Sequence, residues 1–129
     1  MYYAIQVNTS PYASKGGLSA YRFAEAALSK SHDVIQVFFY QEGIYHALRY
    51  ALPPDDELNL TRAWSELAYK RGVDLAVCIS AAQRRGLLGV DEARRQGVTD
   101  PMLADGFRVV GLGQWLDATQ KADRFMVFV

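Results

Sequence analysis

Short apolar segments of strand character alternate with amphipathic, helix-like segments along this chain of 129 residues. The strand-like segments are rich in β-branched and aromatic residues and cover residues 3–7, 34–40, 73–78 and 124–129, with a weaker one at 107–110. Helical periodicity occupies residues 17–28, 58–70 and 112–122. Strands that alternate with helices in one short chain predict a mainly parallel sheet covered on both faces. We therefore expect a three-layer α/β/α fold with a five-stranded, flavodoxin-like sheet.

Length and composition fit a single domain over residues 1–129. Half of the residues are hydrophobic and 22% are charged, which argues against disorder. No apolar run approaches the roughly 20 residues of a membrane-spanning helix, and the N-terminus has no secretion-signal pattern. The single cysteine suits a reducing compartment. We expect a cytoplasmic protein.

The charge balance bears on the kind of partner. Fourteen basic and fourteen acidic side chains cancel, so the composition lacks the positive surplus typical of direct nucleic-acid binding. A protein or a small molecule is the favoured partner. One cysteine and two dispersed histidines form no metal-ligand pattern, and we expect no metal and no organic cofactor.

Cys78 stands where the apolar run 73–77 gives way to the helix-like stretch 79–85. In an open parallel sheet this junction is the edge that presents reactive groups. The backbone N–H groups of Ile79, Ser80 and Ala81 would favour a negatively charged sulfur there. The residues alone leave a second interpretation equally open, in which Cys78 is a small buried hydrophobe.

Glu42, Tyr45 and His46 follow the second strand, at the same sheet edge as Cys78, and are candidate pocket residues. His46 is placed to help hold or release a sulfur, although a partly exposed helix position is the simpler interpretation. No histidine lies near Cys78 in the sequence to form a thiol–imidazole pair. Arg84 and Arg85 are candidates for electrostatic support of a thiolate, but they lie more than a turn from a helix start at Ile79, so exposure to solvent is the simpler expectation.

Two connecting segments invite further interpretations. Residues 8–17 form a loop of hydroxyl and glycine residues that resembles a phosphate-wrapping loop, but neither GxGxxG nor GxxxxGK[ST] is present. A simple helix-starting loop is the alternative. Residues 86–106 form a long excursion with a predicted short helix at 90–96, which is placed in sequence to cover the thiol.

Several segments together resemble the DsrE/TusD family of sulfurtransferase subunits. They match in order and separation over essentially the whole chain: VFFYQEGIY at 37–45, NLTRAW at 59–64, VCISAAQRRG at 77–86, GF at 106–107 and GLG at 111–113. Each string is weak alone, whereas the set is specific. The resemblance implies a DsrE-like sheet of five parallel strands, and it places the family's persulfide-bearing cysteine at Cys78.

The resemblance also implies a pathway and partners. Cys78 would accept sulfur from a TusA-like donor and pass it to a TusE-like acceptor, for 2-thiolation of the tRNA wobble uridine. The chain would work in a heterohexamer with TusB-like and TusC-like subunits, without touching the tRNA itself. A role in dissimilatory sulfur oxidation, a noncatalytic assembly subunit, and a flavin- or phosphate-binding module at Thr9 to Gly17 remain the alternatives.

Overall fold

The computed structural model describes residues 1–129 and contains one sheet of five parallel strands in the order β4-β3-β2-β1-β5. The elements follow one another as β1 (Tyr2–Val7), α1 (Gly16–Ser29), β2 (Asp33–Phe39), η1 (Gln41–Ala47, a 3₁₀-helix), α2 (Leu60–Arg71), β3 (Leu75–Cys78), α3 (Ile79–Arg84), α4 (Val90–Arg95), β4 (Phe107–Val110), α5 (Leu112–Lys121) and β5 (Arg124–Phe128). The predicted α/β class, the five strands and the three layers are confirmed.

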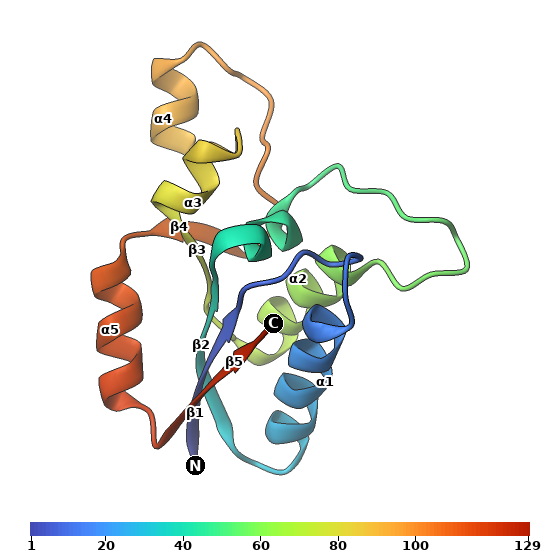
Figure 1. The fold of residues 1–129 in the computed structure, drawn as a ribbon, viewed down its shortest axis with the longest axis vertical. Coiled ribbons are helices and arrows are strands. Elements are labelled where there is room, and N and C mark those ends of the chain that lie inside the picture. The colour runs from blue at the N-terminus through green and yellow to red at the C-terminus, as the bar shows by residue number, and fades with distance from the viewer.

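Connection handedness explains the layers. Crossovers between parallel strands are right-handed, so the steps from β1 to β2 and from β2 to β3 place α1 and α2 on one face. The return from β4, at one edge, to β5, at the other, places α5 on the opposite face. Figure 1 shows this division, with the sheet between α1 and α2 on one side and α5 on the other.

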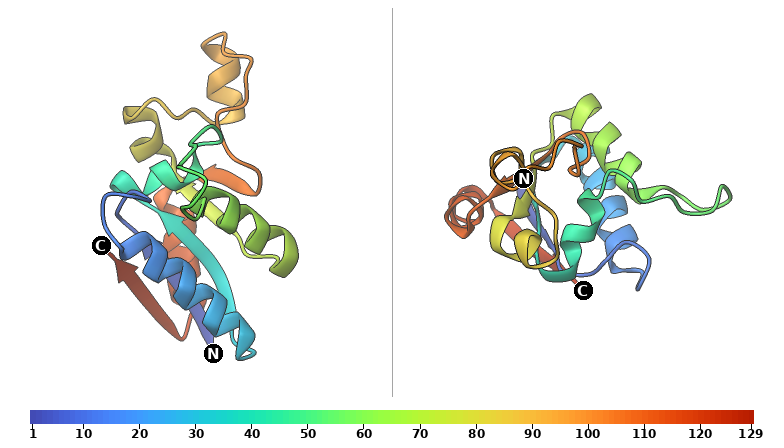
Figure 2. Two further views of the ribbon diagram at one scale, coloured as in Figure 1. Left: turned by 90° about the vertical axis from the view of Figure 1, so that its right-hand side faces the viewer. Right: turned by 90° about the horizontal axis from the view of Figure 1, so that it is seen from above.

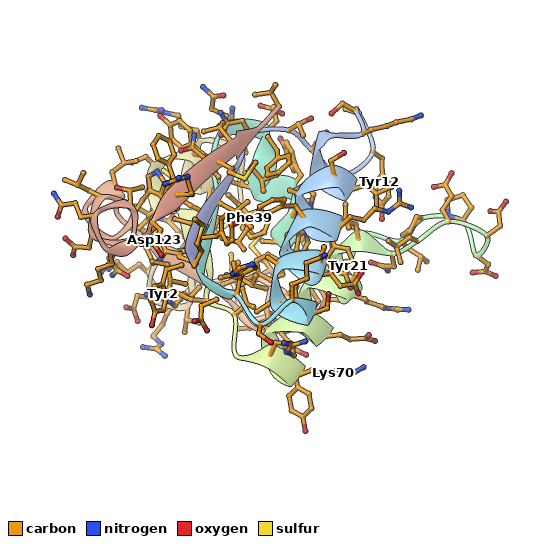
Figure 3. All side chains as sticks on the ribbon, turned by 90° about the horizontal axis from the view of Figure 1, so that it is seen from below. Tyr2, Tyr12, Tyr21, Phe39, Lys70 and Asp123 are labelled. Atoms are coloured by element: carbon orange, nitrogen blue, oxygen red, sulfur yellow. The ribbon has the colours of Figure 1, made fainter.

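Aromatic side chains fill the layer between the sheet and α1 and α2. The ring of Phe39 lies edge-on to Trp64 of α2, with centroids 5.4 Å apart, and 5.2 Å from the ring of Phe107 of β4. Phe39 and Trp64 are fully buried. Figure 3 shows Phe39 in the interior, on the side of the sheet where Tyr21 projects from α1.

The second layer is thinner. Phe38, which follows the pleat to the opposite face, stacks on Trp115 of α5 with centroids 5.2 Å apart. Only α5 covers this face, and β5 at the sheet edge remains largely exposed. The core is therefore centred on β1, β2 and β3.

Local signals set the limits of α2. The side chain of Asn59 caps the helix by accepting a hydrogen bond of 3.1 Å from the Arg62 N–H, and Gly72 ends it with φ 69°. The preceding connection, which contains Pro53 and Pro54, projects from the body of the protein (Figure 2). The helix thus starts about two residues later than its apolar periodicity alone predicts.

Candidate functional site

Cys78 is both the last residue of β3 and the N-cap residue of α3, with extended backbone angles (φ −61°, ψ 119°). The sequence predicted this junction correctly. The residue is only 2% exposed, and its side chain accepts no capping hydrogen bond from the first turn of α3. Its strand is interior, paired with β2 on one side and β4 on the other. The thiol is therefore not accessible to solvent in this structure.

One side of α3 is buried and the other faces solvent. Cys78, Ala81, Ala82 and Arg85 recur at the spacing that places residues on one side of a helix, and both alanines are buried. Ile79, in contrast, is 38% exposed. The first turn of α3 contains the three predicted N–H donors, and of these residues Ile79 and Ser80 are exposed whereas Ala81 is buried.

The 3₁₀-helix η1 packs against β3 and α3 at the carboxyl edge of the sheet. It enters through Gln41, which has a positive φ of 50°, and it rests on the end of β1 at Gly43. A Cβ atom at Gly43 would lie 1.9 Å from the carbonyl oxygen of Val7, so only glycine fits. Tyr45 is half-buried and packs against the core.

Glu42 of η1 and Arg85 at the end of α3 form an ion pair. The Arg85 Nε and Nη2 atoms lie 2.8 Å and 2.7 Å from the same Glu42 oxygen, Oε1. Arg85 Nη1 also donates to the carbonyl oxygen of Ala81 at 3.1 Å. The expectation that Arg85 faces solvent is therefore wrong, because its guanidinium joins two segments that are 43 residues apart in sequence. Arg84 is exposed, as expected.

His46 is fully buried, so the expectation of a partly exposed helix position is wrong. The indole N–H of Trp64 donates to His46 Nδ1 at 3.2 Å, which leaves the ring proton on Nε2 to be donated to the carbonyl oxygen of Thr9 at 3.0 Å. Burial lowers the pKa of His46 from 6.5 to about 4, against the opposing effect of the Thr9 hydrogen bond. The imidazole is neutral and serves as a junction between η1, α2 and the β1–α1 loop.

His46 and Cys78 belong to different faces of the sheet. Val77 is the register neighbour of Phe39, whose ring contacts Trp64 and His46 on the face covered by α2. Strand alternation then directs the Cys78 side chain to the opposite face. Of the candidate pocket residues, Glu42 is tied to α3 beside Cys78, whereas the hydrogen bonds of His46 are made on the other side.

The β1–α1 loop is packed against its neighbours. The Thr9 and Ser14 hydroxyls bond to each other at 2.8 Å, and Ser14 Oγ accepts from the Gly16 N–H. A Cβ at Gly16 would lie 2.3 Å from the Val129 carbonyl oxygen, and one at Gly17 would lie 2.5 Å from the His46 ring. Close packing therefore explains these glycines, in agreement with the simpler interpretation of a helix-starting loop.

The excursion between α3 and β4 contains the predicted short helix, observed as α4. Together with the following segment it lines a cavity of about 580 Å³, to which Arg49, Met102 and Phe107 contribute. Cys78 is not among the lining residues. Figure 2 shows α4 standing away from the sheet, and the elements that contact α3 include η1, β3 and β4. That this excursion covers the thiol stays a prediction.

The arrangement supplies one thiol and no adjacent base. No group of three or more His, Cys, Asp and Glu side chains comes together that could hold a metal ion. No helix has the length and apolar character needed to cross a membrane. The chemistry that this site can offer is that of a single sulfur nucleophile.

Comparison with known proteins gives consistent matches over the whole chain. The model of the DsrE/DsrF-like family matches residues 1–128. "Putative sulfurtransferase DsrE" of Allochromatium vinosum is 42% identical over 128 residues, covering 99% of this chain and 98% of that protein. "Sulfurtransferase TusD homolog" of Vibrio parahaemolyticus is 41% identical, covering 98% and 96%, and "Sulfurtransferase TusD" of Salmonella newport is 41% identical, covering 99% and 100%.

A solved structure has the same fold. The crystal structure of the ychN protein from E. coli superposes with a TM-score of 0.79 and covers 99% of both chains, at 20% sequence identity. At that identity the likeness concerns the fold alone. It confirms the predicted DsrE-like architecture.

Proposed function

The chain belongs to the DsrE/DsrF-like family, and from this membership we propose that it is a sulfur-relay sulfurtransferase whose single domain carries sulfur as a persulfide on Cys78. Sulfurtransferase activity rests on curated relatives of that name, which are about 41% identical over nearly the full chain. The observation that carries the role of Cys78 is its position: it is the only thiol, and it ends an interior strand at the carboxyl edge of the sheet.

The proposed reaction is two exchanges at sulfur. The Cys78 thiolate attacks the outer sulfur of a donor persulfide, the donor S–S bond breaks, and the donor cysteine leaves as a thiolate. An acceptor thiolate then attacks the terminal sulfur of the Cys78 persulfide and releases the Cys78 thiolate. One sulfane sulfur moves and no net oxidation occurs, so the reaction needs no cofactor.

Burial constrains how these exchanges take place. An attacking thiolate must reach the sulfur along the S–S axis, and a side chain that is 2% exposed does not permit that approach. Ile79 and Ser80, which follow Cys78 directly, are exposed, so a local displacement of α3 from η1 would open a path. Transfer therefore includes an opening step, before or during contact with the donor.

We infer a place in tRNA thiolation from the relatives named TusD. In this role a TusA-like protein donates sulfur, a TusE-like protein accepts it, and the product is 2-thiolated wobble uridine, with all steps in the cytoplasm. The relative named DsrE, at 42% identity, supports the alternative role in dissimilatory sulfur oxidation. Single-turnover transfer from sulfur-labelled donor to each candidate acceptor tests the choice: the true acceptor takes the label, and labelling of neither acceptor would contradict both roles.

Related subunits are the proposed partners, as a heterohexamer with TusB-like and TusC-like chains. The exposed edge supports assembly, because β5 pairs only with β1 and carries Phe125 (59% exposed) and Val127 (45% exposed). Phe125→Lys should reduce co-purification with sister subunits, whereas Tyr69→Lys, at a site 91% exposed on α2, should not. Equal co-purification of both variants would exclude β5 as the interface.

A noncatalytic assembly subunit is the second candidate function, and the burial of Cys78 favours it. One variant, Cys78→Ser, distinguishes the two functions. Cys78→Ser keeps the size of the side chain while removing the nucleophile, so it should abolish sulfur transfer without preventing assembly. Undiminished transfer by this variant would favour the assembly role.

A further inference from the structure

We propose that the Glu42–Arg85 ion pair is a latch that controls how often Cys78 becomes accessible to a partner's thiol. The inference rests on the proposed role of Cys78 as the sulfur carrier. Glu42 and Arg85 act as positioning residues, because neither is required to touch the sulfur. Three features of the α3–η1 contact carry the proposal.

The first feature is the side of α3 on which Arg85 lies. Arg85 is seven residues after Cys78, so both lie on the same side of the helix, with buried Ala81 and Ala82 between them. The small alanine side chains allow close approach of neighbouring segments, and η1 contacts both α3 and β3, the two elements that meet at Cys78. Cys78 and the ion-paired Arg85 therefore lie at opposite ends of the same side of α3.

The second feature is that the pair bridges two separate segments. Arg85 bonds through two nitrogens to Glu42 Oε1 and through a third to the Ala81 carbonyl oxygen. The Arg85 side chain is only 24% exposed, although that of Glu42 is 55% exposed. One guanidinium thus fixes the end of α3 to the first turn of η1, and separation of the two segments breaks this pair.

The third feature is the difference in anchoring between the two segments. η1 is held in place by Gly43, which packs against the end of β1, and by His46, which forms hydrogen bonds with Thr9 and Trp64. α3 has only six residues, and its N-cap residue makes no side-chain capping bond. The element that moves is therefore α3, and Glu42 is the fixed half of the latch. Local opening of such a short helix, which is exposed on one side, requires much less free energy than global unfolding.

Alkylation of Cys78 by iodoacetamide in the free, folded protein tests the latch, since Cys78 is the only thiol. Glu42→Gln and Arg85→Gln should each be alkylated about two- to fivefold faster than the wild type, the range expected for loss of a partly exposed ion pair. Arg84→Gln is the matched control, because Arg84 is exposed on the same helix and forms no ion pair, and its rate should equal that of the wild type.

Denaturant dependence separates local opening from loss of stability. If the latch is local, the alkylation rate at low urea should be nearly independent of urea, and amide exchange should increase in residues 79–84 only. The charge swap Glu42→Arg with Arg85→Glu should restore part of the protection. Rates unchanged in Glu42→Gln and Arg85→Gln, a rate raised equally in Arg84→Gln, or a rate that follows global unfolding would each overturn the latch.

These outcomes differ from a failure of the proposed function. Iodoacetamide needs no donor or acceptor, so the alkylation rates report on the latch alone. Loss of sulfur transfer in Cys78→Ser, with unchanged alkylation in the latch variants, would leave the carrier role standing and remove the latch. Transfer that persists in Cys78→Ser would remove the carrier role whatever the alkylation rates show.

Discussion

The buried histidine of η1 predicts a specific dependence of stability on pH. His46 has a pKa of about 4 in the folded protein, lowered by burial, against an ordinary value of 6.5. The unfolded chain therefore binds more protons than the folded protein between these values, and stability falls as the pH decreases through this window. Above pH 6.5 the contribution of His46 is almost fully present.

The magnitude follows from proton linkage. At pH 5 an unfolded histidine is mostly protonated, while His46 in the folded protein is mostly neutral, so the free energy of unfolding is about 2 kcal/mol lower than at pH 7. This figure depends little on the folded pKa, because the protonation of the unfolded chain dominates at pH 5. His46 contacts Thr9, Gly17, Phe39 and Trp64, none of which carries a charged side chain.

Urea unfolding at pH 7 and pH 5 measures the effect. His46→Gln should be less stable than the wild type at pH 7, by about 1–3 kcal/mol for the lost buried hydrogen bonds. Between pH 7 and pH 5, however, its free energy of unfolding should not show the decrease of about 2 kcal/mol that His46 causes in the wild type. His32→Gln is the control, because His32 is partly exposed and binds the N-terminal amine, and it should keep the wild-type loss. A wild-type loss equal to that of His46→Gln would refute the argument, as would a His46 pKa near 6.5 by NMR titration.

Three further substitutions test the packing and charge assignments. Gly43→Ala should destabilise the protein by about 2–3 kcal/mol, measured by urea unfolding, because its Cβ would meet the Val7 carbonyl oxygen. Gly113→Ala, in α5 with open space around it, should instead stabilise by roughly 0.5–1 kcal/mol; the opposite order would contradict the packing. Arg108 holds the pKa of Asp74 below its ordinary value, so stability from this pair is present above that value and is lost as the pH falls below it. Asp74→Asn should lower the free energy of unfolding by roughly 0.5–1 kcal/mol at neutral pH and should reduce its decrease at acid pH. An unchanged decrease at acid pH would exclude the Asp74–Arg108 pair as its cause.

The sequence predicted the fold well because each element carries its own local signal. Strand β3 is a continuous apolar run, β2 is apolar apart from Asp33 and Gln36, and helices α1 and α2 show clear apolar periodicity. Errors of about two residues occur at ends such as the start of β3, where Val73 and Asp74 precede the hydrogen-bonded strand. Such limits depend on pairing with neighbouring strands, which local pattern does not contain.

The position of Cys78 at a strand–helix junction was predicted correctly, but the surroundings of the candidate residues were not. The location of Cys78 follows from a local change from strand to helix, whereas its burial depends on tertiary packing, in which η1, 31 or more residues away in sequence, contacts β3 and α3. His46 accepts a hydrogen bond from Trp64, 18 residues away in sequence, and Glu42 pairs with Arg85, 43 residues away, so neither partner can be identified from local pattern. The available sequence signals were an indole that requires an acceptor and two opposite charges at one sheet edge.

Mass spectrometry of Cys78 after incubation with a persulfide donor is the most direct test of the sulfur-carrier role. The peptide that contains Cys78 should gain the mass of one sulfur atom, lose it on addition of a thiol acceptor, and show no gain in Cys78→Ser. An unmodified Cys78 peptide in the presence of a donor that loads other carriers, with the partner subunits bound, would contradict the role.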